Sequence, residues 1–136
     1  MKFKILAIEH IAIAVNELDQ PAHLFGQILG INNSSTEVIK DQKVLTDIFD
    51  TGEGKVELIK STSNDSPITR FLSKRGQGVH HIAFRVDNLE IALEEISKIG
   101  VKLIDNVPRI GAEGMLIAFL DPKSTSGILI ELCQKP

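Results

Sequence analysis

The sequence has a single cysteine and neither tryptophan nor tyrosine. The lone Cys133 cannot form a disulfide within the chain. We expect a cytoplasmic protein, because the N-terminal stretch runs into charged residues and His instead of a cleavage site. Fifteen Lys and Arg against 18 Asp and Glu give a formal net charge of -3, so no basic field for nucleic acid is present. Apolar runs are far shorter than the roughly 20 residues that cross a bilayer. We therefore expect neither a nucleic-acid nor a membrane partner.

The composition is that of an ordinary globular protein. Of the 136 residues, 43% are apolar and 24% are charged. A chain of this length has room for one compact domain, or for two small halves that share a core. We expect a single domain spanning residues 1–136.

An internal duplication is the most informative feature of the chain. HIAIAVNEL, which begins at His10, recurs as HIAFRVDNL, which begins at His81. Later in each half a second string recurs in the same order, KVELIK around Glu57 and ILIELCQ around Glu131. The histidines are 71 residues apart and the glutamates 74. Two matched strings in one order indicate a duplicated structural module.

The four repeated strings alternate as strands do. Alternation puts His10, His81, Glu57 and Glu131 on the face opposite the apolar residues of each strand. The apolar sets are Ile11, Ile13 and Val15; Ile82, Phe84 and Val86; Val56 and Leu58; and Ile128, Ile130 and Leu132. Two histidines and two glutamates are therefore expected to face one space.

A helical pattern follows each histidine strand and ends at a glycine, Gly30 in one half and Gly100 in the other. Each helix is expected to cover the apolar sheet face of its half. The residues predicted to make that contact are Phe25, Ile28 and Leu29 in the first half and Ala92, Ile96 and Ile99 in the second.

Further strands are predicted near residue 38 and over 44–49 and 114–120. A short helix between the halves starts with Ser66 as N-cap and Pro67 as first helical residue, and its apolar side is Ile68, Phe71 and Leu72. The predicted fold class is α+β, with two tandem βαβββ modules forming a cup-shaped, curved mixed sheet. Module one spans about 5–60, the linker helix about 61–78, and module two about 79–134.

Two imidazoles and two carboxylates are ligands suited to divalent Zn, Co, Mn, Ni or Fe. A cation held by four protein groups can keep a position open, from which it polarises a carbonyl oxygen and stabilises an enolate. The quartet therefore indicates proton abstraction next to a carbonyl group. The remaining histidines are expected to be structural, with His23 exposed on a helix and His80 packed against its neighbours.

Several strings resemble a known family. HIAIAV, SPITRFLSKRGQGVHHIAFRVDN, VPRIGAEG and AFLDPKSTSGILIELCQ resemble methylmalonyl-CoA epimerases, which belong with glyoxalase I to the vicinal oxygen chelate group. The resemblance implies that His10, Glu57, His81 and Glu131 bind a divalent metal, with cobalt first and zinc, manganese or nickel as alternatives. It further implies an acyl-CoA substrate, methylmalonyl-CoA, and a homodimer.

For such a substrate, the thioester carbonyl and the free carboxylate could together chelate the metal. Inversion at C2 requires a proton to leave from one face and return on the other. We expect Glu131 to act as ligand and proton carrier, and Glu57 as ligand or second base. The alternatives are a glyoxalase I-type lactoylglutathione lyase and a metal-free binding protein of the bleomycin-resistance kind. A non-haem iron dioxygenase is disfavoured, because its facial triad needs only three ligands.

The chain departs from the family pattern at four positions. Thr46 stands where some epimerases carry a carboxylate, and alternation aims the adjacent Asp47 at the opposite face. Asp121 stands where the family often has His, and Glu113 occupies a loop position that the family commonly fills with His or a small residue. For Lys123, Ser124 and Arg85, substrate contact and an ordinary turn or salt bridge remain open as alternatives.

Overall fold

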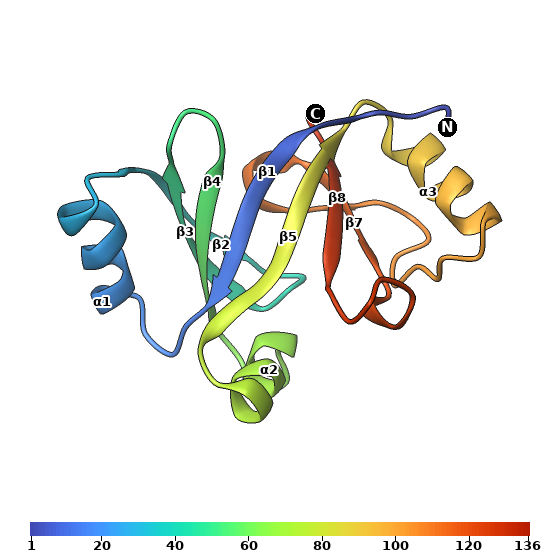
Figure 1. The fold of residues 1–136 in the computed structure, drawn as a ribbon. Helices are drawn as coiled ribbons and strands as arrows, with labels where there is room; N and C mark the ends of the chain where they lie inside the picture. The colour runs from blue at the N-terminus through green and yellow to red at the C-terminus, as the bar shows by residue number, and fades with distance from the viewer. The chain divides into compact units, whose positions relative to one another are not determined.

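A computed structural model describes residues 1–136 in full. The chain forms two compact units. The first unit is His10–His80, and the second unit combines Met1–Glu9 with His81–Pro136. The long strand β1 (Ile5–Ala14) and the strand β5 (Gly78–Val86) contribute residues to both units (Figure 1).

The first unit contains a four-stranded mixed sheet in the order β2-β3-β4-β1. Strand β1 runs parallel to β4, and the other neighbouring strands are antiparallel. The elements that follow β1 are α1 (Asp19–Ala22), the π-helix η1 (His23–Ile28), β2 (Asn32–Ile39), β3 (Val44–Asp50), β4 (Lys55–Ser61) and α2 (Pro67–Arg75).

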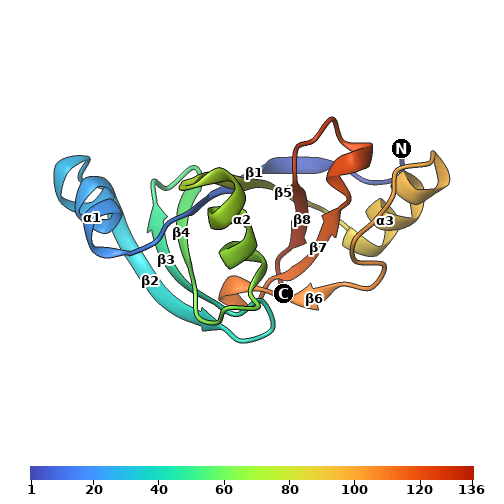
Figure 2. The same ribbon diagram turned by 90° about the horizontal axis from the view of Figure 1, so that it is seen from below.

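The helices of the first unit cover opposite faces of its sheet (Figure 2). On the face under α1 and η1, Val15, Phe49 and Leu58 are buried, and Phe25 packs against them. On the other face, the core under α2 consists of Ala12, Ala14, Val44, Ile59 and Ile68. Helix α2 begins as predicted, since the Ser66 hydroxyl accepts a hydrogen bond from the Ile68 N–H at 3.2 Å and Pro67 follows.

The second unit contains strands in the order β5-β8-β7-β6, with β5 parallel to β8. Its elements after β5 are α3 (Leu89–Lys98), β6 (Arg109–Ile110), the 3-10 turn η2 (Ala112–Gly114), β7 (Leu116–Leu120), the 3-10 turn η3 (Pro122–Ser124) and β8 (Ile130–Gln134). Helix α3 covers one sheet face (Figure 1), over a core of Val86, Leu89, Ala92, Leu93, Ala118, Leu120 and Leu132. The opposite face carries Ala83, Met115, Ile117, Phe119 and Cys133.

The predicted fold class is confirmed. Both β1-α1-β2-β3-β4 and β5-α3-β6-β7-β8 follow the βαβββ order, and their sheets are mixed. Gly30 and Gly100, the predicted helix ends, have φ values of 71° and 95°, a left-handed conformation in which glycine carries no Cβ penalty.

Part of the predicted helix packing is wrong. Ile28 and Leu29 are 65% and 57% exposed, because η1 is a π-helix and its wider turn rotates these residues away from the face that buries Phe25. Ile99 is 67% exposed, since α3 ends at Lys98 and Ile99 lies beyond its last turn. Ile128 is 50% exposed, because β8 begins only at Ile130.

None of the helices is long and apolar enough to span a membrane.

Candidate metal centre

In the first unit, His10 and Glu57 form a buried pair. The parallel register of β1 and β4 sets Ala12 opposite Glu57, so His10, two residues before Ala12, shares the sheet face of Glu57. The Nδ1 atom of His10 lies 3.0 Å from Oε2 of Glu57, and both side chains are 7% exposed. A short imidazole–carboxylate contact is thus held inside the protein by two neighbouring strands.

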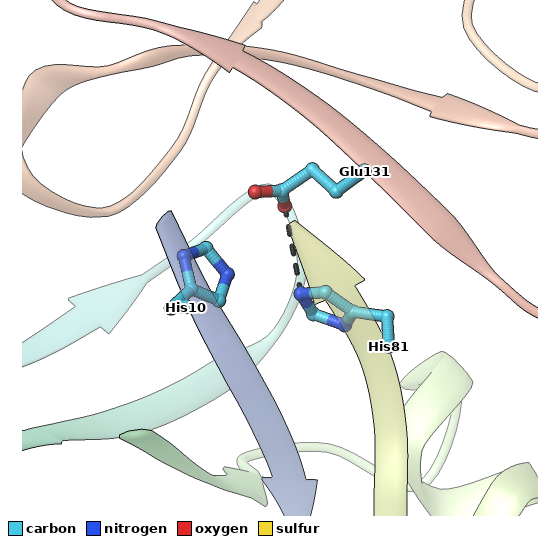
Figure 3. A group of neighbouring side chains, drawn as sticks. All are labelled: His10, His81 and Glu131. Atoms are coloured by element: carbon cyan, nitrogen blue, oxygen red, sulfur yellow. Dashed lines mark ion pairs between the residues drawn. The ribbon is translucent and has the colours of Figure 1, made fainter. Parts of the chain in front are cut away.

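In the second unit, His81 and Glu131 form the corresponding pair. The register of β5 and β8 sets Ala83, two residues after His81, opposite Glu131. The Nε2 atom of His81 lies 3.6 Å from Oε1 of Glu131, marked by the dashed line in Figure 3, and the side chains are 6% and 5% exposed. The duplication therefore repeats the strand register as well as the residue types.

The distances within each pair fit a shared cation. Zinc and similar ions hold imidazole nitrogen and carboxylate oxygen at about 2.1 Å, which separates two ligand atoms by about 3.0 Å at a right angle and about 3.4 Å in a tetrahedron. The separations in the two pairs are 3.0 and 3.6 Å. Each pair could hold a divalent ion, and the combination of nitrogen and oxygen donors is the one that Zn, Co, Mn and Ni accept.

The surroundings of the second pair are apolar. The edge of the His81 ring meets the Phe119 ring with centroids 5.1 Å apart and the ring planes at 89°. Ala83, Met115 and Cys133 belong to the same buried cluster. A carboxylate in such surroundings is costly to bury unless a positive charge balances it. A cation bound next to Glu131 would supply that charge.

The other two histidines lie where the sequence predicts. His23 is exposed on η1. His80 packs edge-on against Phe71, with ring centroids 5.0 Å apart. Burial, with a smaller contribution from the positive charge of Arg75, lowers the pKa of His80 to about 4, so this imidazole is neutral at pH 7. Both positions are those of structural residues.

The two residues of β3 closest to Glu57 on the ligand side carry no carboxylate. The register of β3 and β4 sets Ile48 opposite Glu57 and Thr46 opposite Ile59, so Thr46 faces the ligand side. Asp47 lies opposite Leu58 on the other face, where its Oδ1 accepts a hydrogen bond from the Thr36 hydroxyl at 2.5 Å. The predicted orientations of these two residues are confirmed.

The loop residues left open by the sequence have structural contacts. Asp121 caps η3 by accepting a hydrogen bond from the Lys123 N–H at 2.9 Å. The Ser124 hydroxyl accepts one from the Lys102 N–H at 3.0 Å. These contacts favour an ordinary structural turn over substrate contact for this loop. Glu113 is exposed in η2, with a left-handed φ of 58°.

Two charged residues on the ligand faces escape the sequence analysis. Glu37 on β2 lies opposite Thr46, and Arg109 on β6 lies opposite Ile117. Alternation along β2 would have indicated Glu37 only if its register against β3 had been known. Strand β6 has two residues, too few for any periodic signal.

Sequence comparison with known proteins identifies the family of this chain. The profile of the Glyoxalase/Bleomycin resistance protein/Dioxygenase superfamily matches residues 9–119. The chain is 42% identical to the uncharacterized protein YqjC of Bacillus subtilis, over 93% of this chain and 91% of that protein. It is 32% identical to the mitochondrial methylmalonyl-CoA epimerase of Mus musculus, over 97% of this chain and 75% of that one.

Solved structures give the same result. A methylmalonyl-CoA epimerase in complex with methylmalonyl-CoA and NH4+ matches with a TM-score of 0.92 and 33% identity, over 97% of this chain and 96% of that one. The Mycobacterium tuberculosis methylmalonyl-CoA epimerase matches with a TM-score of 0.93 and 28% identity, over 97% and 89%. The chain therefore belongs to the Glyoxalase/Bleomycin resistance protein/Dioxygenase superfamily, whose profile matches most of it. Within this superfamily, the chain belongs to the methylmalonyl-CoA epimerase family.

Proposed function

We propose that this protein epimerises methylmalonyl-CoA at C2, interconverting the R and S forms. The observation that carries the proposal is the repeated buried pair, His10 with Glu57 and His81 with Glu131, each built on the same strand register. Relatives named as methylmalonyl-CoA epimerases, and a similar solved structure in complex with methylmalonyl-CoA, support the choice of substrate.

We further propose that the two pairs together bind one divalent cation, and that the chain acts as one domain around it. Cobalt is the first choice by family resemblance, followed by zinc, manganese and nickel. When bound, the cation would polarise the thioester carbonyl of the substrate and stabilise the enolate that proton removal creates. The imidazoles of His10 and His81 and the two carboxylates would supply four ligands and leave room for substrate oxygens.

The proton route is assigned to the glutamates. Inversion needs a proton taken from one face of C2 and returned to the other. Glu131 acts as ligand and proton carrier, and Glu57 as ligand or second base. The orientation of β3 supports the role of Glu57, because Thr46 has no ionisable group and Asp47 lies on the far face of the sheet.

The test is C2 exchange in deuterated water. The purified protein is stripped of metal, reloaded with cobalt, and incubated with one epimer of methylmalonyl-CoA, while the C2 proton is followed by NMR. We expect deuterium to enter C2 and both epimers to appear. The variant Glu131→Gln should lose at least about 100-fold in rate, whereas Glu53→Gln, the same change in an exposed turn, should keep the wild-type rate.

Other outcomes identify the alternatives. Metal bound without exchange would contradict the epimerase and, if a hemithioacetal of glutathione is consumed instead, would indicate glyoxalase I chemistry. Ligand binding with neither metal nor turnover would indicate a binding protein.

We also propose a homodimer in the cytoplasm. Leu6 and Ile8 lie on the same face of β1 and are each 52% exposed, and neighbouring apolar side chains of this kind are suited to burial against a second copy. Sedimentation analysis tests the assembly, and a monomer at all concentrations would contradict it. The cytoplasmic location stays a prediction, to be tested by cell fractionation.

A further inference from the structure

Arg109 lies on the same sheet face of the second unit as Glu131, with strand β7 between them. On β8, Cys133 is two residues beyond Glu131 and therefore on the same face. The register sets Ile117 of β7 opposite Cys133, and Arg109 of β6 opposite Ile117. The strand β6 thus carries a guanidinium group onto the face that bears the candidate ligands.

A single aromatic ring connects Arg109 to His81. The Cζ atom of Arg109 lies over the Phe119 ring, 6.0 Å from its centroid. The edge of the His81 ring contacts the same Phe119 ring. The Phe119 ring is therefore in contact with both the guanidinium group of Arg109 and the His81 imidazole that is proposed to bind the metal.

Asp105 holds the Arg109 side chain in place. The Nε atom of Arg109 lies 3.1 Å from Oδ1 of Asp105, and Nη2 lies 3.5 Å from Oδ2. Oδ2 also accepts a hydrogen bond from the Phe119 N–H at 2.9 Å, which ties Asp105 to β7. Asp105 contacts two of the three guanidinium nitrogens, and the Arg109 side chain is 34% exposed. An anion could therefore reach a pre-oriented donor group.

The equivalent position in the first unit has the opposite charge. There Ile59 is two residues beyond Glu57, Thr46 lies opposite Ile59, and Glu37 lies opposite Thr46. The duplication thus sets Glu37 where the second unit has Arg109. A negatively charged group is attracted to Arg109 and repelled from Glu37, so the corresponding positions of the two units differ in the ligand charge that they favour.

We propose that Arg109 binds the free carboxylate of the substrate and selects acyl-CoA thioesters that carry one. This inference rests on the proposed function and adds the residue that recognises the acid group. A guanidinium forms paired, charge-assisted hydrogen bonds to a carboxylate, which a thioester without that group cannot accept. Asp105 serves as a positioning residue.

The test compares two ligands that differ only in this group. Dissociation constants for methylmalonyl-CoA and propionyl-CoA are measured by calorimetry on the cobalt-loaded wild type and on Arg109→Gln. We expect the variant to bind methylmalonyl-CoA about 10- to 100-fold more weakly and propionyl-CoA within twofold of wild type. Arg109→Lys, which keeps the charge but not the fork, should fall between. Lys98→Gln, which removes an exposed positive charge on α3, should change neither constant.

Each remaining outcome overturns the inference. Equal weakening for both ligands would assign Arg109 to the CoA moiety or to folding, and unchanged binding of both would remove it from recognition. Retained propionyl-CoA affinity shows that the variant is folded. The proposed function fails separately, when the wild type binds methylmalonyl-CoA yet exchanges no C2 deuterium.

Discussion

Removing one candidate metal ligand should greatly reduce the increase in Tm that metal binding gives. The substitution Glu131→Gln keeps the shape of a side chain that is 5% exposed but removes its charge. A cation that binds only the folded state adds RT ln(1 + [M]/Kd), which is about 2.7 kcal/mol at 100 times Kd. For 136 residues, an unfolding entropy of about 2.1 cal/mol/K per residue converts this into a Tm increase of about 9 °C.

The variant should respond far less. Loss of a residue that only supports a metal ligand already weakens metal binding by up to about 100-fold. Loss of a charged ligand itself should weaken it by about 100-fold or more. At the same metal concentration the gain then falls to about 0.4 kcal/mol, a Tm increase of about 1–2 °C. Without metal, the variant should be at least as stable as wild type, because a buried amide costs less than a buried carboxylate.

Differential scanning calorimetry with chelator, and then with cobalt chloride, measures both effects. Glu53→Gln serves as the matched control, since Glu53 is exposed in the turn between β3 and β4. Its metal-induced shift should equal that of wild type. An equal shift in Glu131→Gln would refute the assignment of Glu131 as a ligand, and a large loss of stability without metal would show that the carboxylate has a structural role instead.

Three further predictions concern stability. Leu58→Ala empties a fully buried position under α1 and should cost about 2–5 kcal/mol in urea unfolding, so a loss below 1 kcal/mol would contradict the core described here. The hydrogen bonds from Lys43 and Ser63, with the charge of Lys43, lower the pKa of Asp65 from 3.8 to about 2, so these contacts stabilise the fold above pH 4, and the contribution disappears as the pH falls toward 2. Asp65→Asn should therefore be less stable than wild type at pH 7 and equal to it below pH 2, and a difference that persists in acid would exclude this cause. Gly111→Ala would set a Cβ 2.9 Å from two side-chain carbons of Ile117, and we expect a loss of about 1–3 kcal/mol by thermal unfolding, whereas an unchanged Tm would show that Ile117 moves freely.

Much of the candidate site is readable from the sequence because strand alternation is a local property. A period of two places His10 and Glu57 opposite their apolar neighbours, and a repeated string marks His81 and Glu131 as their counterparts. The linker helix is equally local, since the Ser66 cap, the Pro67 that follows and the buried Ile68 lie within three residues. These features required no knowledge of distant contacts.

The positions that escaped prediction depend on longer-range structure. Ile28 and Leu29 fit an ideal helix, but η1 is a π-helix, in which Phe25 contacts Phe49 of β3. Such a change of period follows from how the helix packs on the sheet, and residue types alone do not encode it.

The sequence by itself determined the duplicated βαβββ order, the four candidate ligands and the side of each strand on which they lie, because periodicity and capping act over a few neighbouring residues. Only the tertiary structure decided which charged residues accompany those ligands. Glu37 and Arg109 reach the ligand faces through the pairing of β2 with β3 and of β6 with β7. Strand register is set by hydrogen bonds between distant segments, and a shift of one residue would have turned both side chains to the other face.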